Sequence, residues 1–227
     1  MKLSFPWSFG LVAALAAVLC QNAAGQAAQS PAAPSADAQS RESKGVPPRA
    51  APGDYSGHAQ AGAVTIAAEF TAHSVVTAEA LLTTEDYVVV EVGLFGPPET
   101  RLRLSYADFS VRINGKKAPV MAEEYNAVFA SLKDPEWEPP EAVEKKSKTN
   151  IGGSSKSDTG SLPPIVHVPI ELKRAMQLRV QKASLPEGER PLPAAGLIFF
   201  PYRGKNMQSV ELIYNGPAGK TTVTLHP

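Results

Sequence analysis

The chain has 227 residues, and its 22 lysine and arginine residues are balanced by 22 aspartate and glutamate residues. This length allows one ordinary domain with additional flanking segments. The balanced charge lacks the basic excess of a protein that binds phosphate backbones, so we expect no nucleic-acid partner.

Residues 1–25 have the features of a secretory signal peptide. Lys2 supplies a positive charge, and residues 9–19 form an apolar run that is too short to span a bilayer comfortably. Small side chains at Ala23 and Gly25 then place a cleavage site directly after residue 25. The pattern predicts export to the periplasm or to the outside of the cell. No later stretch is apolar enough to cross a membrane, so we expect no transmembrane segment in the mature chain.

Two alternatives concern the processing of this segment. Cleavage before Ala28 fits the small residues nearly as well as cleavage before Gln26. Cys20, the only cysteine, would be the lipidated residue if the protein were a bacterial lipoprotein, but the bulky Leu19 lies where that signal requires a small residue. Without lipidation the mature chain contains no cysteine and therefore no disulfide.

The next segment, residues 26–62, is rich in alanine, proline, serine and glutamine. It contains almost no large apolar side chain before Tyr55. Such a segment cannot bury enough apolar surface to offset the entropy that ordering would cost. The composition therefore predicts a disordered spacer, followed by one folded domain over residues 63–227.

Alternating apolar residues predict β-strands in the first half of that domain. Candidate strands lie at residues 63–70, 73–82 and 86–95. The third has apolar side chains on both faces, so we predict that it is a central strand of a sheet. After the following strand, Asn114 and Gly115 form the pair that a two-residue type I′ turn requires, because both positions need a positive φ.

Two segments have apolar residues spaced three and four apart, which predicts helices at residues 123–132 and 169–183. Between them, residues 141–164 contain very few large apolar residues and are predicted to form a mobile loop. Three further strands close the chain, at residues 197–202, 209–214 and 221–226.

Many short strands separated by turn residues are typical of a β-sandwich, so we predict a mainly β fold. Residues 86–115, 131–140 and 192–225 resemble the corresponding segments of a family of secreted bacterial immunoglobulin-like domains of unknown function. The resemblance implies export and an immunoglobulin-like β-sandwich. The spacing and composition described above add one or two short helical insertions and long disordered segments to that sandwich. The helix at residues 169–183 departs from the simplest form of such domains. The resemblance implies no catalytic residues in this chain.

Motifs for catalysis and for cofactor binding are absent from the sequence. The four histidines lack the close spacing of a zinc site, and neither a nucleophile elbow nor a phosphate-binding loop occurs. The acidic residues at 134–138 are interpreted as a solvated turn rather than a calcium site. We therefore expect no metal, no cofactor and no catalytic residue. Whether the protein is an enzyme stays open, because a sequence cannot show two facing carboxylates.

Trp137, Tyr202 and Arg203 are the candidate ligand-binding residues. Aromatic rings beside a cation can bind sugars or peptides through stacking and hydrogen bonds. The competing interpretation, which the strand pattern favours, places Phe199 or Phe200 in the core, with Tyr202 capping the strand and Arg203 in solvent.

The sequence as a whole favours a secreted, non-catalytic binding or structural module. Its partner would be an unidentified protein or a component of the cell envelope. The alternative is a carbohydrate-binding or carbohydrate-processing accessory protein that uses Trp137 and Tyr202.

Overall fold

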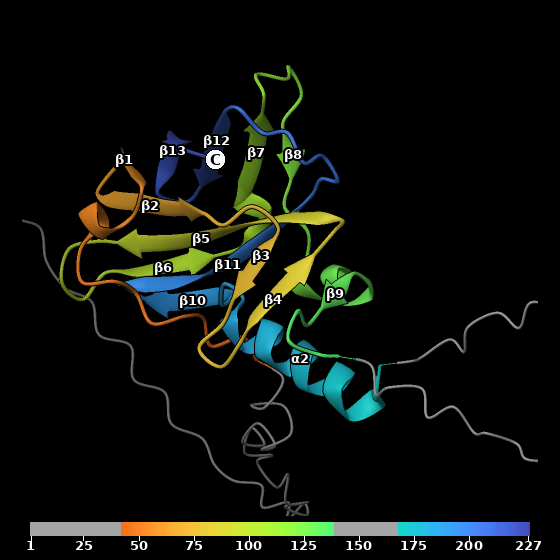
Figure 1. Cartoon of the computed structure of the whole chain (residues 1–227). Helices are drawn as coiled ribbons and strands as arrows, with labels where there is room; N and C mark the ends of the chain where they lie inside the picture. The colour runs from red at the N-terminus through yellow and green to blue at the C-terminus, as the bar shows by residue number, and fades with distance from the viewer. Residues whose placement is uncertain (1–41, 139–167) are drawn as a thin grey trace, which may run out of the picture. The chain divides into compact units, whose positions relative to one another are not determined.

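The structure is a computed structural model, and it describes residues 42–138 and 168–227 (Figure 1). Three predicted features lie outside the described residues: the signal peptide at residues 1–25, the first part of the spacer at 26–41, and the mobile loop at 141–164.

The first of two large antiparallel sheets is built around β5 (Tyr87–Phe95). Its strand order is β1 (Gly57–Ala61), β2 (Val64–Phe70), β5 and β11 (Ala194–Pro201). Because β5 pairs with β2 on one side and with β11 on the other, the prediction of a central strand is confirmed.

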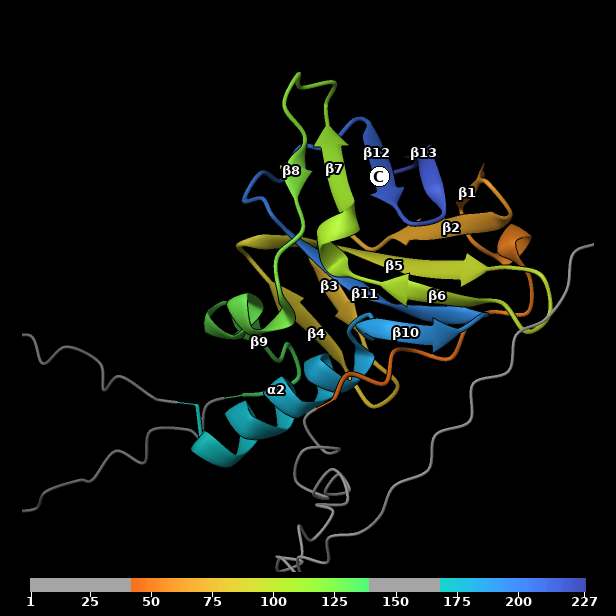
Figure 2. The same ribbon diagram turned by 180° about the vertical axis from the view of Figure 1, so that it is seen from behind.

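The second large sheet is formed mostly by the end of the chain. Its strand order is β13 (Gly219–Leu225), β12 (Val210–Gly216), β7 (Phe109–Ile113) and β8 (Val120–Met121). In both views its strands run across those of the first sheet (Figures 1 and 2). The three strands that were predicted to close the chain are confirmed as β11, β12 and β13.

One hydrophobic core joins the two sheets. Ile66, Val90 and Phe200 contribute to it from the first sheet, and Val111 and Leu212 contribute from the second. Solvent reaches none of these five side chains. The fold is therefore mainly β, with two antiparallel sheets packed on a shared core.

A second hydrophobic core covers the opposite face of the first sheet. It is closed by α2 (Ile170–Ala183), by the 3-10 helix η3 (Tyr125–Ala130) and by a hairpin of β3 (Ser74–Val76) and β4 (Leu81–Thr84). Both views place α2 on the side of the first sheet that faces away from the second sheet (Figures 1 and 2). Phe199 and Phe200 are both buried, one in each core, because successive residues of a strand point to opposite faces.

Local signals predicted some elements correctly and others only in part. The predicted helix at residues 169–183 is confirmed as α2, whereas residues 123–132 form η3 and the start of the short strand β9 (Leu132–Lys133) instead of an α-helix. The strand predicted at residues 73–82 is interrupted by a turn, in which the Thr77 hydroxyl donates to the carbonyl oxygen of Ala80 at 2.7 Å.

The remaining elements are η1 (Pro52–Asp54), β6 (Arg101–Leu104), η2 (Tyr106–Asp108) and β10 (Gly188–Pro191).

The turn predicted at Asn114 and Gly115 is present, with φ values of 54° and 65°. Pairing of β7 with β8 nevertheless begins only at Val111 and Val120, so the turn is the tip of a longer connection. The Asn114 side chain accepts a hydrogen bond from the backbone N–H of Gln208 at 2.7 Å. It therefore also orders the segment that leads into β12.

The structure differs from the predicted spacer over residues 46–61. Val46 forms a β-bridge with Ala195 at the edge of β11, and β1 pairs with β2 along its whole length. Tyr55 is buried. The segment is ordered with few large apolar residues because backbone hydrogen bonds and ion pairs to the first sheet hold it in place.

Candidate functional site

Two of the predicted ligand-binding residues, Tyr202 and Arg203, line one shallow hollow at the end of β11. Tyr202 is half-buried, and the Lys116 ammonium lies 5.5 Å from the centre of its ring. The side chain of Arg203 is 80% exposed and its Nε lies 2.8 Å from Oδ1 of Asp86. This arrangement agrees with a buried strand that ends at Pro201 and is followed by an exposed turn.

Trp137 does not line that hollow. It follows β9 and closes a turn, in which its backbone N–H donates to the carbonyl oxygen of Asp134 at 3.2 Å. The structure therefore brings together two of the three predicted residues, and leaves the third outside the hollow that they line.

A mostly apolar cavity lies elsewhere, beside the second core. It is enclosed by an N-terminal segment that we call the strap (residues 44–51), by the β3–β4 turn, by β5 and by the last turn of α2. We call it the strap cavity. Its lining residues are Lys44, Gly45, Val46, Pro47, Val76, Thr77, Ala78, Glu79, Glu91, Arg179, Lys182 and Ala183. The cavity volume of about 350 Å³ falls within the range of small-molecule sites.

Small residues occupy several positions in the lining of this cavity. Gly45 has a φ of +79°, and a Cβ at this position would lie 2.1 Å from the carbonyl oxygen of Ala195. Only glycine can therefore bring the strap so close to the edge of β11. Ala78 of the β3–β4 turn and Ala183 of α2 also line the cavity, and neither side chain extends beyond Cβ.

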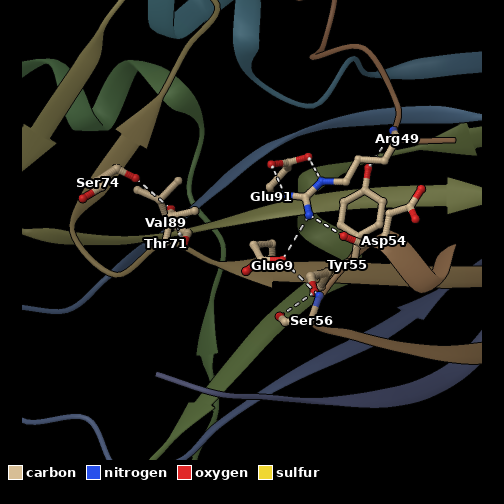
Figure 3. A network of polar contacts seen from close by, with 10 residues as sticks. Arg49, Asp54, Tyr55, Ser56, Glu69, Thr71, Ser74, Val89 and Glu91 are labelled. Atoms are coloured by element: carbon tan, nitrogen blue, oxygen red, sulfur yellow. Dashed lines mark hydrogen bonds and ion pairs between the residues drawn. The ribbon is translucent and has the colours of Figure 1, made fainter. Parts of the chain in front are cut away.

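Arg49 fastens the strap to the first sheet (Figure 3). Glu69 of β2 and Glu91 of β5 are directly opposite each other in the strand register. Arg49 donates from Nε and Nη2 to the two oxygens of Glu91 at 3.3 and 3.1 Å, and from Nη1 to Oε2 of Glu69 at 3.2 Å. One guanidinium thus joins two carboxylates that would otherwise repel each other across the strands.

The same guanidinium makes two further contacts within its own segment. Nη1 donates to the carbonyl oxygen of Asp54 at 2.6 Å, and the guanidinium carbon lies 4.4 Å from the centre of the Tyr55 ring. Burial disfavours the charged form of Arg49, but the hydrogen bond and charge of Glu91 and the charge of Glu69 outweigh it, so the pKa of Arg49 is raised. For Tyr55, in contrast, burial raises the pKa, because it disfavours the charged phenolate. The cluster is an arrangement that holds chain segments together.

The charged residues that line the strap cavity are unequally paired. Arg179 Nε lies 3.0 Å from Oε2 of Glu79, and Glu91 is held by Arg49. Lys44 and Lys182 also line the cavity, and neither has an acidic partner in the part of the chain that the structure describes. The lining therefore presents two cations whose charge is not neutralised by a neighbouring carboxylate.

Two further observations concern the described ranges 42–138 and 168–227. They contain no group of three or more histidine, cysteine, aspartate or glutamate side chains arranged to hold a metal ion. None of their helices combines the length and the apolar character needed to span a membrane.

Comparisons with protein-family models, with curated proteins and with solved structures found no match to this chain. The resemblance to secreted immunoglobulin-like domains stays a prediction.

Sequence reasoning missed the strap cavity. One signal was available, since Glu91 is the only charged residue between Tyr87 and Phe95 in an otherwise apolar strand. Its partner Arg49 lies 42 residues earlier, in the segment whose composition predicted a spacer.

Proposed function

We propose that the protein is an exported, non-catalytic binding module built on an immunoglobulin-like β-sandwich. The second sheet supports the fold assignment, because its order β13–β12–β7–β8 corresponds to the G–F–C–C′ order of such sandwiches. The structure departs from that pattern in two respects. In the first sheet β5 lies between β2 and β11, and the strands of the two sheets cross (Figures 1 and 2), whereas those of immunoglobulin sandwiches are nearly aligned. That extra central strand carries the face on which the second core and the strap cavity are built.

The strap cavity is the observation that carries the binding function. Four separate segments of the chain line it, and its walls are mostly apolar with several charged residues among them. Such a combination is typical of sites that bind small molecules.

A thermal-shift screen tests this proposal. The mature protein is incubated with a library of small apolar compounds, and the Tm is compared between the natural protein and Ala78→Trp. Ala78 lines the cavity, so an indole at this position should occupy it. Ala78 is also exposed in the β3–β4 turn, so the substitution should not disturb either core. Ala63→Trp, in the exposed β1–β2 turn, is the control. A compound that binds the native state raises the Tm.

We expect some compounds to raise the Tm of the natural protein and of the control but not that of Ala78→Trp. If no compound separates Ala78→Trp from the control, the cavity does not bind ligands of this kind.

Export rests on the sequence of residues 1–25. Mass spectrometry of the mature protein should find an N-terminus at Gln26 or Ala28. A lipid on Cys20 would replace this proposal with a lipoprotein, and a retained Met1 would refute export.

A second candidate function, carbohydrate binding, is favoured by the hollow at Tyr202. Two tyrosines, two cations and the Asp86 carboxylate line it, which suits stacking and hydrogen bonding to a sugar. A pull-down on a panel of polysaccharides tests it. Retention that is lost in Tyr202→Ala and kept in Trp137→Ala supports the hollow, and no retention on any polysaccharide refutes it.

A further inference from the structure

The strap cavity combines apolar walls with a specific imbalance of charge. Val46, Pro47 and Val76 provide aliphatic surface, and the two carboxylates in the lining are each bound by an arginine. A cationic ligand would therefore have to compete with Arg49 or Arg179 for its counter-charge. An anionic ligand meets no such competition, because the ammonium groups of Lys44 and Lys182 have no acidic partner among the described residues.

We propose that the strap cavity binds a small amphipathic carboxylate, whose apolar chain fills the cavity and whose acid group is held by Lys44 and Lys182. This inference rests on the proposed function, because it names the ligand class of the same cavity.

Two physical arguments support the carboxylate over a neutral chain. Apolar walls favour any chain of suitable size through the surface removed from water. Hydrogen bonds between an ammonium and a carboxylate are stronger than those between neutral groups, so a terminal acid adds affinity that an alcohol cannot. The two lysines come from different elements, the strap and α2, so one anion would also link these elements.

Calorimetric titration with three probes of equal chain length tests the proposal. The probes are decanoate, decanol and decyltrimethylammonium, each used below the concentration at which it forms micelles. Decanoate should bind more tightly than decanol by about tenfold, and decyltrimethylammonium should bind most weakly. Added salt should weaken the binding of decanoate and leave the binding of decanol almost unchanged, because salt screens the attraction between the carboxylate and the lysines.

The variant Lys44→Gln with Lys182→Gln isolates the contribution of the cations. It should lose about tenfold in affinity for decanoate while it keeps its affinity for decanol. The matched control is Lys117→Gln with Lys220→Gln, which removes the same total charge from exposed positions outside the cavity lining. This control should bind all three probes as the natural protein does.

The outcomes separate this inference from the proposed function. If decanol or decyltrimethylammonium binds as tightly as decanoate and Ala78→Trp abolishes that binding, the cavity is a binding site but its ligand is not a carboxylate. If the double lysine variant binds decanoate as well as the natural protein does, the role of the lysines is refuted. If none of the three probes binds, the carboxylate inference fails, and the compound screen alone decides whether the cavity binds other ligands.

Discussion

Arg49→Met should lower the free energy of unfolding by about 2–3 kcal/mol, which lies between the values for an exposed and a buried ion pair. Side chains of Arg49 and Glu91 are 33% and 15% exposed, so neither limit applies fully. The substitution keeps most of the length of the stem but removes every hydrogen bond of the guanidinium. It also leaves Glu69 and Glu91 directly opposite each other without a counter-charge, and such pairs are destabilising.

Urea unfolding at neutral pH measures this loss as a change in the transition midpoint. Arg101→Met is the control, because Arg101 pairs with Glu189 at the surface with side chains 56% and 68% exposed, and it should cost less than about 0.5 kcal/mol. Adding Glu91→Gln to Arg49→Met should restore part of the loss, because it removes the unpaired like charge. If Arg49→Met costs no more than the control, the ion pairs do not fasten the strap.

Three further predictions concern packing and charge. Gly196→Ala should be strongly destabilising in a urea titration, because the added Cβ would lie 2.3 Å from the Cα of Leu185, after α2. The control Gly53→Ala should be nearly neutral, because no atom lies within 4 Å of the added Cβ. Leu212→Ala should lower the free energy of unfolding by about 2–5 kcal/mol, because its side chain is fully buried between the two sheets. Trp137→Ala should lower it clearly less, and an equal loss would show that Trp137 belongs to a core. Burial raises the pKa of Asp108 in the folded protein. Its charged form therefore opposes folding once the pH exceeds the pKa that the carboxyl group has in the unfolded chain. Asp108→Asn should therefore be more stable than the natural protein near neutral pH and equal to it near about pH 3, and a constant difference across this range would contradict the assignment.

Strands and turns that depend on local sequence were predictable. β5 follows from its run of valines, and the Asn114–Gly115 turn follows from the positive φ that both positions require. α2 follows from its apolar spacing, which becomes the buried face of Met176, Val180 and Ala183.

Features that depend on distant partners were not predictable. The sequence predicted burial for only one of Phe199 and Phe200, because it did not show that α2 covers the second face of the first sheet. The strap was taken for a spacer because its order depends on Arg49, whose carboxylate partners lie 20 and 42 residues away. Sequence reasoning identified Tyr202 and Arg203, which are neighbours in the chain. It could not identify the strap cavity, which is lined by four separate segments.

An NMR titration of the isotopically labelled protein with decanoate tests the central claim most directly, since it locates binding on the chain. The account predicts saturable shifts of backbone amides confined to the strap, to residues 76–79 at the end of β3 and in the β3–β4 turn, to the region of Glu91 in β5 and to the end of α2. The shifts should be absent in Ala78→Trp. Shifts that cluster around Tyr202 instead, or that spread over the surface without saturating, would contradict the claim that the strap cavity is the binding site.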